Sequence, residues 1–222
     1  MNLDNQQFRN ALLENIQVWN QVAGRLPSSF PIDAIDFLKH FHQTDHILDY
    51  GCGRGRAISF LRKRGFKKLT GCDTSIRMCD AARLQNPESE IIWLETPEKN
   101  SLLRRHGYDG LIAIGVLSSI IPVGERYRLV EQWANLVTRT GRIILGDFGF
   151  SVDPLYLERY EAAILEPRTF ETEDGLMIHH FTLDELEELL SRFFRIIESR
   201  TLIVETVHRR RIPGHVIVAV VL

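Results

Sequence analysis

Apolar residues along this chain follow two alternating spacings. Spacings of three and four over 5–22 predict an amphipathic helix, and a second helix is expected over 33–41. Beyond them, short apolar runs typical of buried strands alternate with helical patterns. The strands are expected at 46–50, 68–73, 91–94, 110–115 and 142–145, and the helices around 58–66, 78–84 and 127–137. This alternation predicts a parallel sheet that is covered on both faces by helices.

The C-terminal part of the chain carries a different signal. Thr182 and Glu185 have the spacing of a capping box, which predicts a helix with an apolar face of leucines. Two strands follow, at 194–204 and 215–222. The segment between them is too short for a crossover helix, so we expect an antiparallel hairpin at the sheet edge. The fold class is therefore α/β, a doubly wound and mostly parallel sheet with an antiparallel C-terminal hairpin strand.

Composition limits the classes of function. The chain has 222 residues, of which 44% are hydrophobic and 25% charged, as expected for a single globular domain over 1–222. A helical cap over 1–45 and an insert over 150–181 are its expected subdivisions. The 27 basic residues nearly balance 29 acidic ones, giving a net charge of -2, so nucleic acid is an unlikely partner and a small molecule a favoured one.

Three cysteines form no disulfide framework, and the chain shows no export signal and no run of about 20 apolar residues. These features predict a cytoplasmic protein without a membrane partner. The oligomeric state is not readable from the sequence.

A glycine-rich turn links the strand over 46–50 to the helix that follows. Gly51, Gly53 and Gly55 occupy alternate positions there, directly after Asp49, and absent Cβ atoms let a ligand approach the backbone. The alternative is that the turn only packs a helix close to the sheet. Asp73 ends the next strand, where a carboxylate accepts hydrogen bonds from ribose hydroxyls. Together the turn and the acid predict a site for adenosine.

The third glycine lies four positions after the first, whereas a dinucleotide fold places it five positions after, where this chain has Arg56. This spacing argues against a dehydrogenase. In motif order over 47–222 the chain resembles the class I S-adenosylmethionine-dependent methyltransferases, a Rossmann-like family, and especially those that act on small molecules.

The resemblance implies a set of cofactor-binding residues. Asp49 would lie beside the methionine part of S-adenosylmethionine, and Asp73 would hold its ribose. The residues that the resemblance assigns to the cofactor are Asp49, Gly51, Gly53, Gly55, Asp73, Thr74, Glu95, Thr96, Ile114 and Gly115. For Ile114 an ordinary core position is an equally good interpretation, and for Glu95 a solvated loop position.

The chemistry of methyl transfer leaves the need for a base open. The reaction is an in-line displacement, so the protein chiefly has to align the acceptor and exclude water. His179 and His180, within the insert, are the candidate catalytic residues because histidine titrates near neutrality. Neighbours on an extended segment point to opposite sides, so at most one would face the cleft, and a structural role remains the alternative. Trp19 and Arg25 are candidates for closing over the cofactor.

We therefore expect an enzyme that moves a methyl group from S-adenosylmethionine to an oxygen or nitrogen of a small molecule, without a metal, leaving S-adenosylhomocysteine. One alternative is a protein or RNA methyltransferase, for which the basic loop Arg209–Arg211 is the support. The other is a non-catalytic partner subunit that binds the cofactor.

Overall fold

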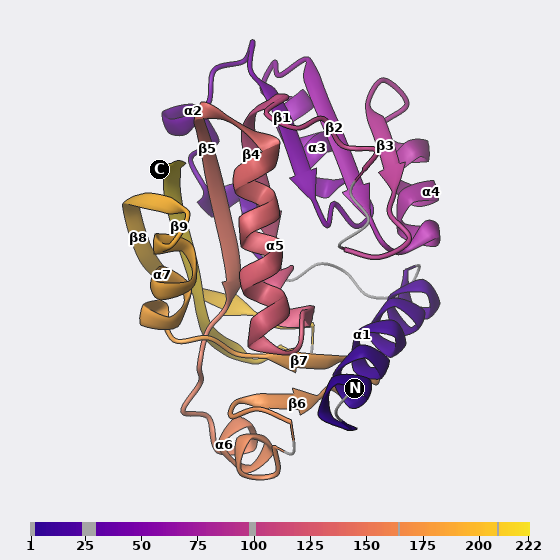
Figure 1. Ribbon diagram of the computed structural model, residues 1–222, viewed down its shortest axis with the longest axis vertical. Coiled ribbons are helices and arrows are strands. Elements are labelled where there is room, and N and C mark those ends of the chain that lie inside the picture. The colour runs from indigo at the N-terminus through magenta and orange to yellow at the C-terminus, as the bar shows by residue number, and fades with distance from the viewer. Residues whose placement is uncertain (1–2, 24–29, 98–100, 164, 208) are drawn as a thin grey trace.

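A computed structural model describes residues 3–23, 30–97, 101–163, 165–207 and 209–222, with side chains from residue 13 onward. Its centre is a seven-stranded sheet with the strand order β3-β2-β1-β4-β5-β9-β8 (Figure 1). The strands of this sheet are β1 (His46–Tyr50), β2 (Lys68–Asp73), β3 (Glu90–Trp93), β4 (Tyr108–Ile114), β5 (Val137–Phe148), β8 (Phe194–Glu205) and β9 (Arg211–Val221).

The direction of the strands fixes where a ligand can lie. β1 pairs in parallel with both β2 and β4, so the chain order reverses between β1 and β4. In open parallel sheets a ligand binds at such a reversal, beyond the carboxyl ends of the strands. β9 is antiparallel to both β5 and β8. The doubly wound sheet and its antiparallel hairpin are thus confirmed, although β5 is much longer than the predicted strand over 142–145.

The helices are α1 (Leu3–Val22), α2 (Phe37–His40), α3 (Arg56–Arg62), α4 (Ile76–Gln85), α5 (Val123–Leu136), α6 (Pro154–Glu161) and α7 (Leu183–Ser191). The helix expected over 33–41 was wrong as one continuous element. A 3-10 turn over Ile32–Ala34 comes first, Ile35 is extended, and α2 restarts after Asp36. Ile35 and Phe37 are both buried, a spacing of two that a single helix does not place on one face. No described helix has the length and apolar character needed to cross a membrane.

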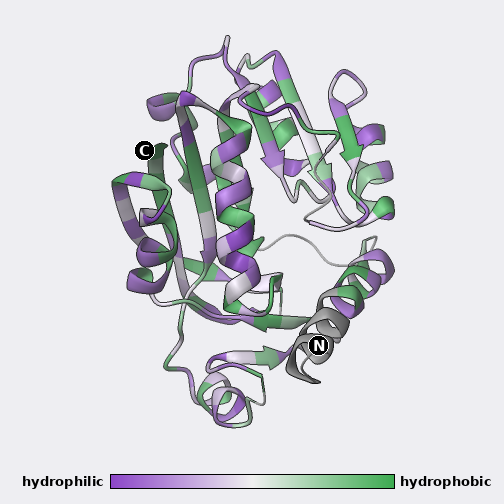
Figure 2. Ribbon diagram, in the orientation of Figure 1, coloured by the Kyte–Doolittle hydropathy of each residue, from purple (hydrophilic) through white to green (hydrophobic). Residues whose placement is uncertain are grey.

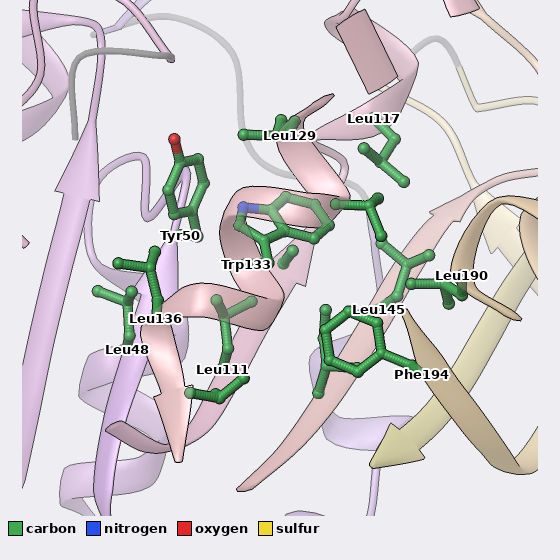
Figure 3. Close-up of a cluster of buried hydrophobic side chains, with 14 of the residues drawn as sticks. Leu48, Tyr50, Leu111, Leu117, Leu129, Trp133, Leu136, Leu145, Leu190 and Phe194 are labelled. Atoms are coloured by element: carbon green, nitrogen blue, oxygen red, sulfur yellow. The ribbon is translucent and has the colours of Figure 1, made fainter. Parts of the chain in front are cut away.

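Two hydrophobic cores cover the two faces of the sheet. One contains α5 and α7 and is centred on Trp133, whose ring meets that of Tyr50 edge-on at a centroid distance of 5.5 Å (Figure 3). The other contains α3, α4 and the segment over 30–41. The hydropathy pattern follows this arrangement, since the central strands are largely apolar while α5 alternates between apolar and polar positions (Figure 2). The helices are therefore held by burial of one stripe each.

The segment after β5 leaves the sheet and forms a small substructure of its own. α6 is followed by an antiparallel pair, β6 (Thr169–Glu171) and β7 (Met177–His179). α1 lies beside β7, where the side chain of Asn15 accepts a hydrogen bond from the Met177 nitrogen at 2.8 Å and donates one to its carbonyl at 2.7 Å (Figure 1). The N-terminal helix and the insert are thereby joined through one buried amide.

A buried ion pair attaches the insert to the main core. The Arg126 guanidinium on α5 donates to the Glu166 carboxylate at 2.8 Å and to the Ile120 carbonyl at 2.7 Å. The Arg126 side chain is 3% exposed and that of Glu166 13%. Close by, the predicted capping box of Thr182 and Glu185 is confirmed at the start of α7.

Replacing Glu166 with alanine should destabilise the protein, because the buried guanidinium would lose its charged partner. We expect a loss of about 3 kcal/mol in the free energy of unfolding, measured by urea denaturation. Asp80→Ala is the matched control, since Asp80 pairs with Arg83 on the exposed surface of α4, and its loss should cost less than about 0.5 kcal/mol. Equal losses for the two variants would contradict the structural role given to Glu166.

Candidate functional site

A cavity of about 770 Å³ lies beyond the carboxyl ends of β1, β2 and β4. Its volume is within the range of roughly 300–1,000 Å³ that small-molecule sites occupy. One half is formed by the glycine turn and the strand ends, and the other by α1, the insert and the end of the β8–β9 hairpin. Residues of the first half include Asp49, Gly51, Gly53, Arg56, Asp73, Thr74, Ile114 and Gly115, and residues of the second half include Trp19, Phe148, Tyr156, Arg159, Phe170, Ile178, His180 and Thr206.

The carboxylate of Asp73 connects the glycine turn to the start of α4. One oxygen accepts a hydrogen bond from the Gly53 nitrogen at 2.8 Å, and the other accepts one from the Ser75 nitrogen at 2.8 Å. Burial raises the pKa of Asp73, while these backbone donors oppose the rise. Each carboxylate oxygen has a further lone pair, so the half-buried group retains acceptor capacity toward the cavity.

The glycines of the turn have different roles. Gly53 has a φ of +53° and no atom within 4 Å of the position where a Cβ would stand, so its surface is open to a ligand. Gly55 has a φ of +77°, but a Cβ there would meet the Asn86 side chain at 2.4 Å and Ala82 at 3.2 Å. Gly55 is not part of the cavity wall. Gly55 therefore serves helix packing, while ligand approach at Gly53 stays a prediction for which the structure leaves room.

Asp49 is a buried carboxylate that faces the cavity. It is 4% exposed, and its Oδ2 has no hydrogen-bond partner among the described residues. Burial, and secondly the nearby charge of Asp73, raise the pKa of Asp49 to about 7, while Arg56 acts in the opposite direction. An unpaired buried oxygen beside a second carboxylate favours a ligand that brings a positive charge or hydrogen-bond donors.

The structure brings together seven of the ten predicted cofactor residues. Asp49, Gly51, Gly53, Asp73, Thr74, Ile114 and Gly115 all line the cavity. Glu95 and Thr96 do not line it. Glu95 is exposed, and its neighbours Leu94 and Pro97 line the cavity instead. Contacts of Glu95 and Thr96 with adenine thus remain a prediction. Leu94 and Pro97 provide an apolar surface against which a flat ring could pack.

The two candidate histidines lie on opposite sides of the extended segment around β7. His180 lines the cavity, as does Ile178 two positions earlier, whereas His179 does not. His179 is buried behind the wall, where its Nδ1 lies 2.9 Å from the Thr169 hydroxyl and its ring near Glu166 and Glu185. This is the alternation expected of an extended strand.

His180 is placed at the cavity but has an unfavourable pKa for a base. Burial, with the charges of His179 and Arg159, lowers its pKa to about 3. A group that binds a proton so weakly is a poor general base near neutral pH. The catalytic role of His180 stays a prediction, and the geometry favours hydrogen bonding by a neutral ring.

Several residues of the second half of the cavity were missed by the sequence interpretation. Phe148, Phe170 and Thr206 are examples, and no periodicity or motif marks them. The position of Thr206 was nevertheless deducible from topology. Because β9 is antiparallel to β5, its first residues lie at the carboxyl end of β5, and the preceding hairpin loop must reach the same edge. Arg25 lies outside the described residues.

Comparisons with known proteins agree with this geometry. A family model described as "Methyltransferase domain" matches residues 47–141. A SAM-dependent methyltransferase from Methanosarcina mazei is similar over 88% of this chain and 99% of its own, with 25% identity and a TM-score of 0.78. A SAM-dependent methyltransferase from Anabaena variabilis is similar over 100% and 96%, with 16% identity and a TM-score of 0.68. A search of curated proteins gave no significant match.

A third similar structure is the 1,6-didemethyltoxoflavin-N1-methyltransferase of Burkholderia thailandensis, with 16% identity, a TM-score of 0.62 and coverage of 97% of this chain and 83% of its own. The sheet order, the glycine turn and the acid at the end of β2 are typical of a Rossmann-like fold for an adenosine-containing cofactor. The family match and the similar structures support the same class, the class I S-adenosylmethionine-dependent methyltransferases. S-adenosylmethionine is the cofactor of this class, and the Burkholderia thailandensis structure is described with S-adenosylhomocysteine bound.

The residues present fit this cofactor. Its methionine part carries an ammonium and a sulfonium, and the cavity offers Asp49 with an unpaired oxygen. Its ribose has two adjacent hydroxyls, for which Asp73 retains acceptor capacity. The open surface at Gly53 leaves room for the ligand backbone to lie against the turn.

Alanine at Gly53 and at Gly55 should have different effects, although both residues have positive φ. Gly55→Ala adds a clash with Asn86 and Ala82 to the backbone strain, so we expect the larger loss in the free energy of unfolding, above the roughly 1–2 kcal/mol of strain alone. Gly53→Ala should lose little more than the strain and should weaken S-adenosylhomocysteine binding. Urea denaturation and calorimetric titration of both variants test this. An equal loss of stability in both would disprove the division of roles.

The affinity for S-adenosylmethionine should fall as the pH drops below about 7. A bound cation favours the ionised form of Asp49, so below its pKa of about 7 the carboxyl must release a proton when the cofactor binds. The dissociation constant should rise toward tenfold per pH unit at lower pH. Asp49→Asn should remove this dependence. Calorimetric titrations of both proteins at several pH values provide the measurement, and a flat wild-type profile would refute it.

Proposed function

We propose that this methyltransferase transfers a methyl group to an oxygen or nitrogen of a small-molecule acceptor. The main support for the proposal is that the predicted cofactor residues and a group of aromatic side chains line the same cavity. A site of this kind surrounds a small ligand and excludes water from it. The acceptor is therefore expected to bind within the cavity rather than across an open surface.

The residues of the chain would act mainly by positioning. When bound, S-adenosylmethionine supplies a methyl group activated by its sulfonium. Asp73 would fix the ribose and Asp49 the methionine end, which together set the direction in which the methyl group points. The aromatic side chains Phe148, Tyr156 and Phe170 would hold the acceptor and keep water out. Alignment of this kind does not require a dedicated base.

The relatives support an acceptor of small size. The Burkholderia thailandensis enzyme is described with 1,6-didemethyltoxoflavin and S-adenosylhomocysteine bound. That acceptor is a small molecule, and by analogy the cavity of this chain would accept one of comparable class. A cytoplasmic location is part of the proposal, supported by the three buried cysteines, which are all unpaired.

A protein or RNA acceptor is the second candidate. It is favoured by the exposed loop Arg209–Arg211, which follows the cavity residues Thr206 and Val207. Arg210, however, pairs with Asp153 at 3.2 Å, so part of this charge is already neutralised within the chain. An RNA acceptor would give binding that falls steeply with salt, whereas a small acceptor would not.

The test of the proposed function is calorimetric titration of the purified protein with S-adenosylmethionine and S-adenosylhomocysteine. Asp73→Asn keeps one acceptor oxygen but removes the charge, and we expect it to weaken binding roughly 10- to 100-fold, since hydrogen bonds to charged groups contribute about 1.5–3 kcal/mol. Asp80→Ala, on the exposed face of α4, should bind as the wild type does. Absence of binding by the folded wild-type protein would refute the proposal and favour a partner-dependent subunit.

A further inference from the structure

The acceptor half of the cavity is built around one polar ring among aromatic ones. His180 lies edge-on to Phe170 at a centroid distance of 4.9 Å and 5.1 Å from Tyr156, and Phe148 lies 6.3 Å away. All four side chains line the cavity. Aromatic walls bind flat apolar surfaces, because ring faces and edges pack against other rings at such distances. The shape and apolar character of the wall therefore favour a planar aromatic ligand.

The hydrogen bonds of His180 determine which ring nitrogen carries the proton. The Tyr160 hydroxyl lies 2.7 Å from the His180 Nδ1 and also accepts a hydrogen bond from the Ser151 nitrogen at 3.2 Å. No other acceptor for this hydroxyl proton is present in the part of the chain that is described, so the hydroxyl donates to Nδ1. Nδ1 then holds a lone pair, and the proton of the neutral ring resides on Nε2.

The ring stays neutral over the physiological range. Burial is the main cause of the lowered pKa of His180, and the charges of His179 and Arg159 act in the same direction. Nε2 makes no hydrogen bond to another described residue, and the ring belongs to the cavity wall. His180 therefore presents a fixed, uncharged N–H donor to whatever occupies this half.

Charge at the rim does not select strongly between cations and anions. Arg159 lies 5.7 Å from the Tyr156 ring centroid and 5.5 Å from that of Phe170, and its guanidinium donates to Glu173 at 3.0 Å. Asp174 also lines the cavity. Both signs of charge are thus present in the cavity wall, and His180 is a polar group that lies among the aromatic rings.

We propose that the methyl acceptor is a planar aromatic molecule with a hydrogen-bond-accepting oxygen, which the Nε2–H of His180 holds while Phe148, Tyr156 and Phe170 contact the rings. The proposal rests on the proposed function and adds the chemical class of the acceptor to it. His180 would be a specificity-determining residue, and Tyr160 a positioning residue that acts through His180.

The binding test uses probes that differ in one feature each. 2-Acetylnaphthalene has a planar ring system and a carbonyl oxygen, 2-ethylnaphthalene lacks the oxygen, and methyl decahydronaphthyl ketone lacks the planar rings. In fluorescence or calorimetric titrations of the protein saturated with S-adenosylhomocysteine, 2-acetylnaphthalene should bind about tenfold more tightly than either control. His180→Phe should remove the advantage over 2-ethylnaphthalene. Equal binding of all three probes, or an unchanged advantage in His180→Phe, would overturn the proposal.

The tautomer is tested without any ligand. Nitrogen-15 NMR of the histidine-labelled protein should show His180 neutral with its proton on Nε2 between about pH 5 and 8. Tyr160→Phe should change the tautomer mixture, whereas Tyr127→Phe, on α5, should not. A proton on Nδ1 in the wild-type protein would overturn the proposal.

The same samples separate the two proposals. Titrations of the probes are repeated without S-adenosylhomocysteine, so the aromatic site is tested whether or not the cofactor binds. Failure of the cofactor to bind refutes the proposed function, while cofactor binding without a preference for 2-acetylnaphthalene refutes the acceptor class alone.

Discussion

The hydrogen bonds of one carboxylate, that of Asp73, hold the cofactor half of the site together. Because β1 and β2 are parallel and in register, the residues that follow them emerge side by side at one edge of the sheet. Asp73 can therefore accept from the turn after β1, at Gly53, and from the start of α4, at Ser75. A single side chain thus links the glycine turn to the start of α4.

The second carboxylate, that of Asp49, makes the site complementary to a positively charged ligand. The charge of nearby Asp73 disfavours ionisation of Asp49, and Asp49 is buried with an oxygen that has no partner among the described residues. Such an arrangement costs free energy in the empty protein. A ligand that brings an ammonium or another hydrogen-bond donor to Asp49 removes part of that cost, and a positive charge removes more of it, whereas an anionic group adds to it. The electrostatics of the cavity thus favour the cofactor over other adenosine compounds.

The sequence predicted the parts of the molecule that repeat a general pattern. The strands, the hairpin and the capping box at Thr182 follow from local periodicity and spacing, and the positions of Asp49 and Asp73 follow from the order of strands. The 3-10 turn at Ile32–Ala34 and the β6–β7 pair were not predicted, because their residues are selected by tertiary packing rather than by a period. The acceptor wall was unpredictable for the same reason: Phe148 and Phe170 are far apart in sequence, and only the folded chain brings both against His180.

The alternation of side chains in the extended segment around β7 affects how the acceptor site can change during evolution. Ile178 and His180 face the cavity, and Met177 and His179 face away from it. Since side chains alternate along a strand, a shift by a single residue would exchange the two sets completely. A shift in one direction would bring His180 to the buried position of His179, near Glu166, and His179 to the cavity position of Ile178. One insertion or deletion in the insert could thereby change which side chains contact the acceptor, while the sheet and the cofactor half stay the same. A new acceptor specificity could therefore evolve in a single step.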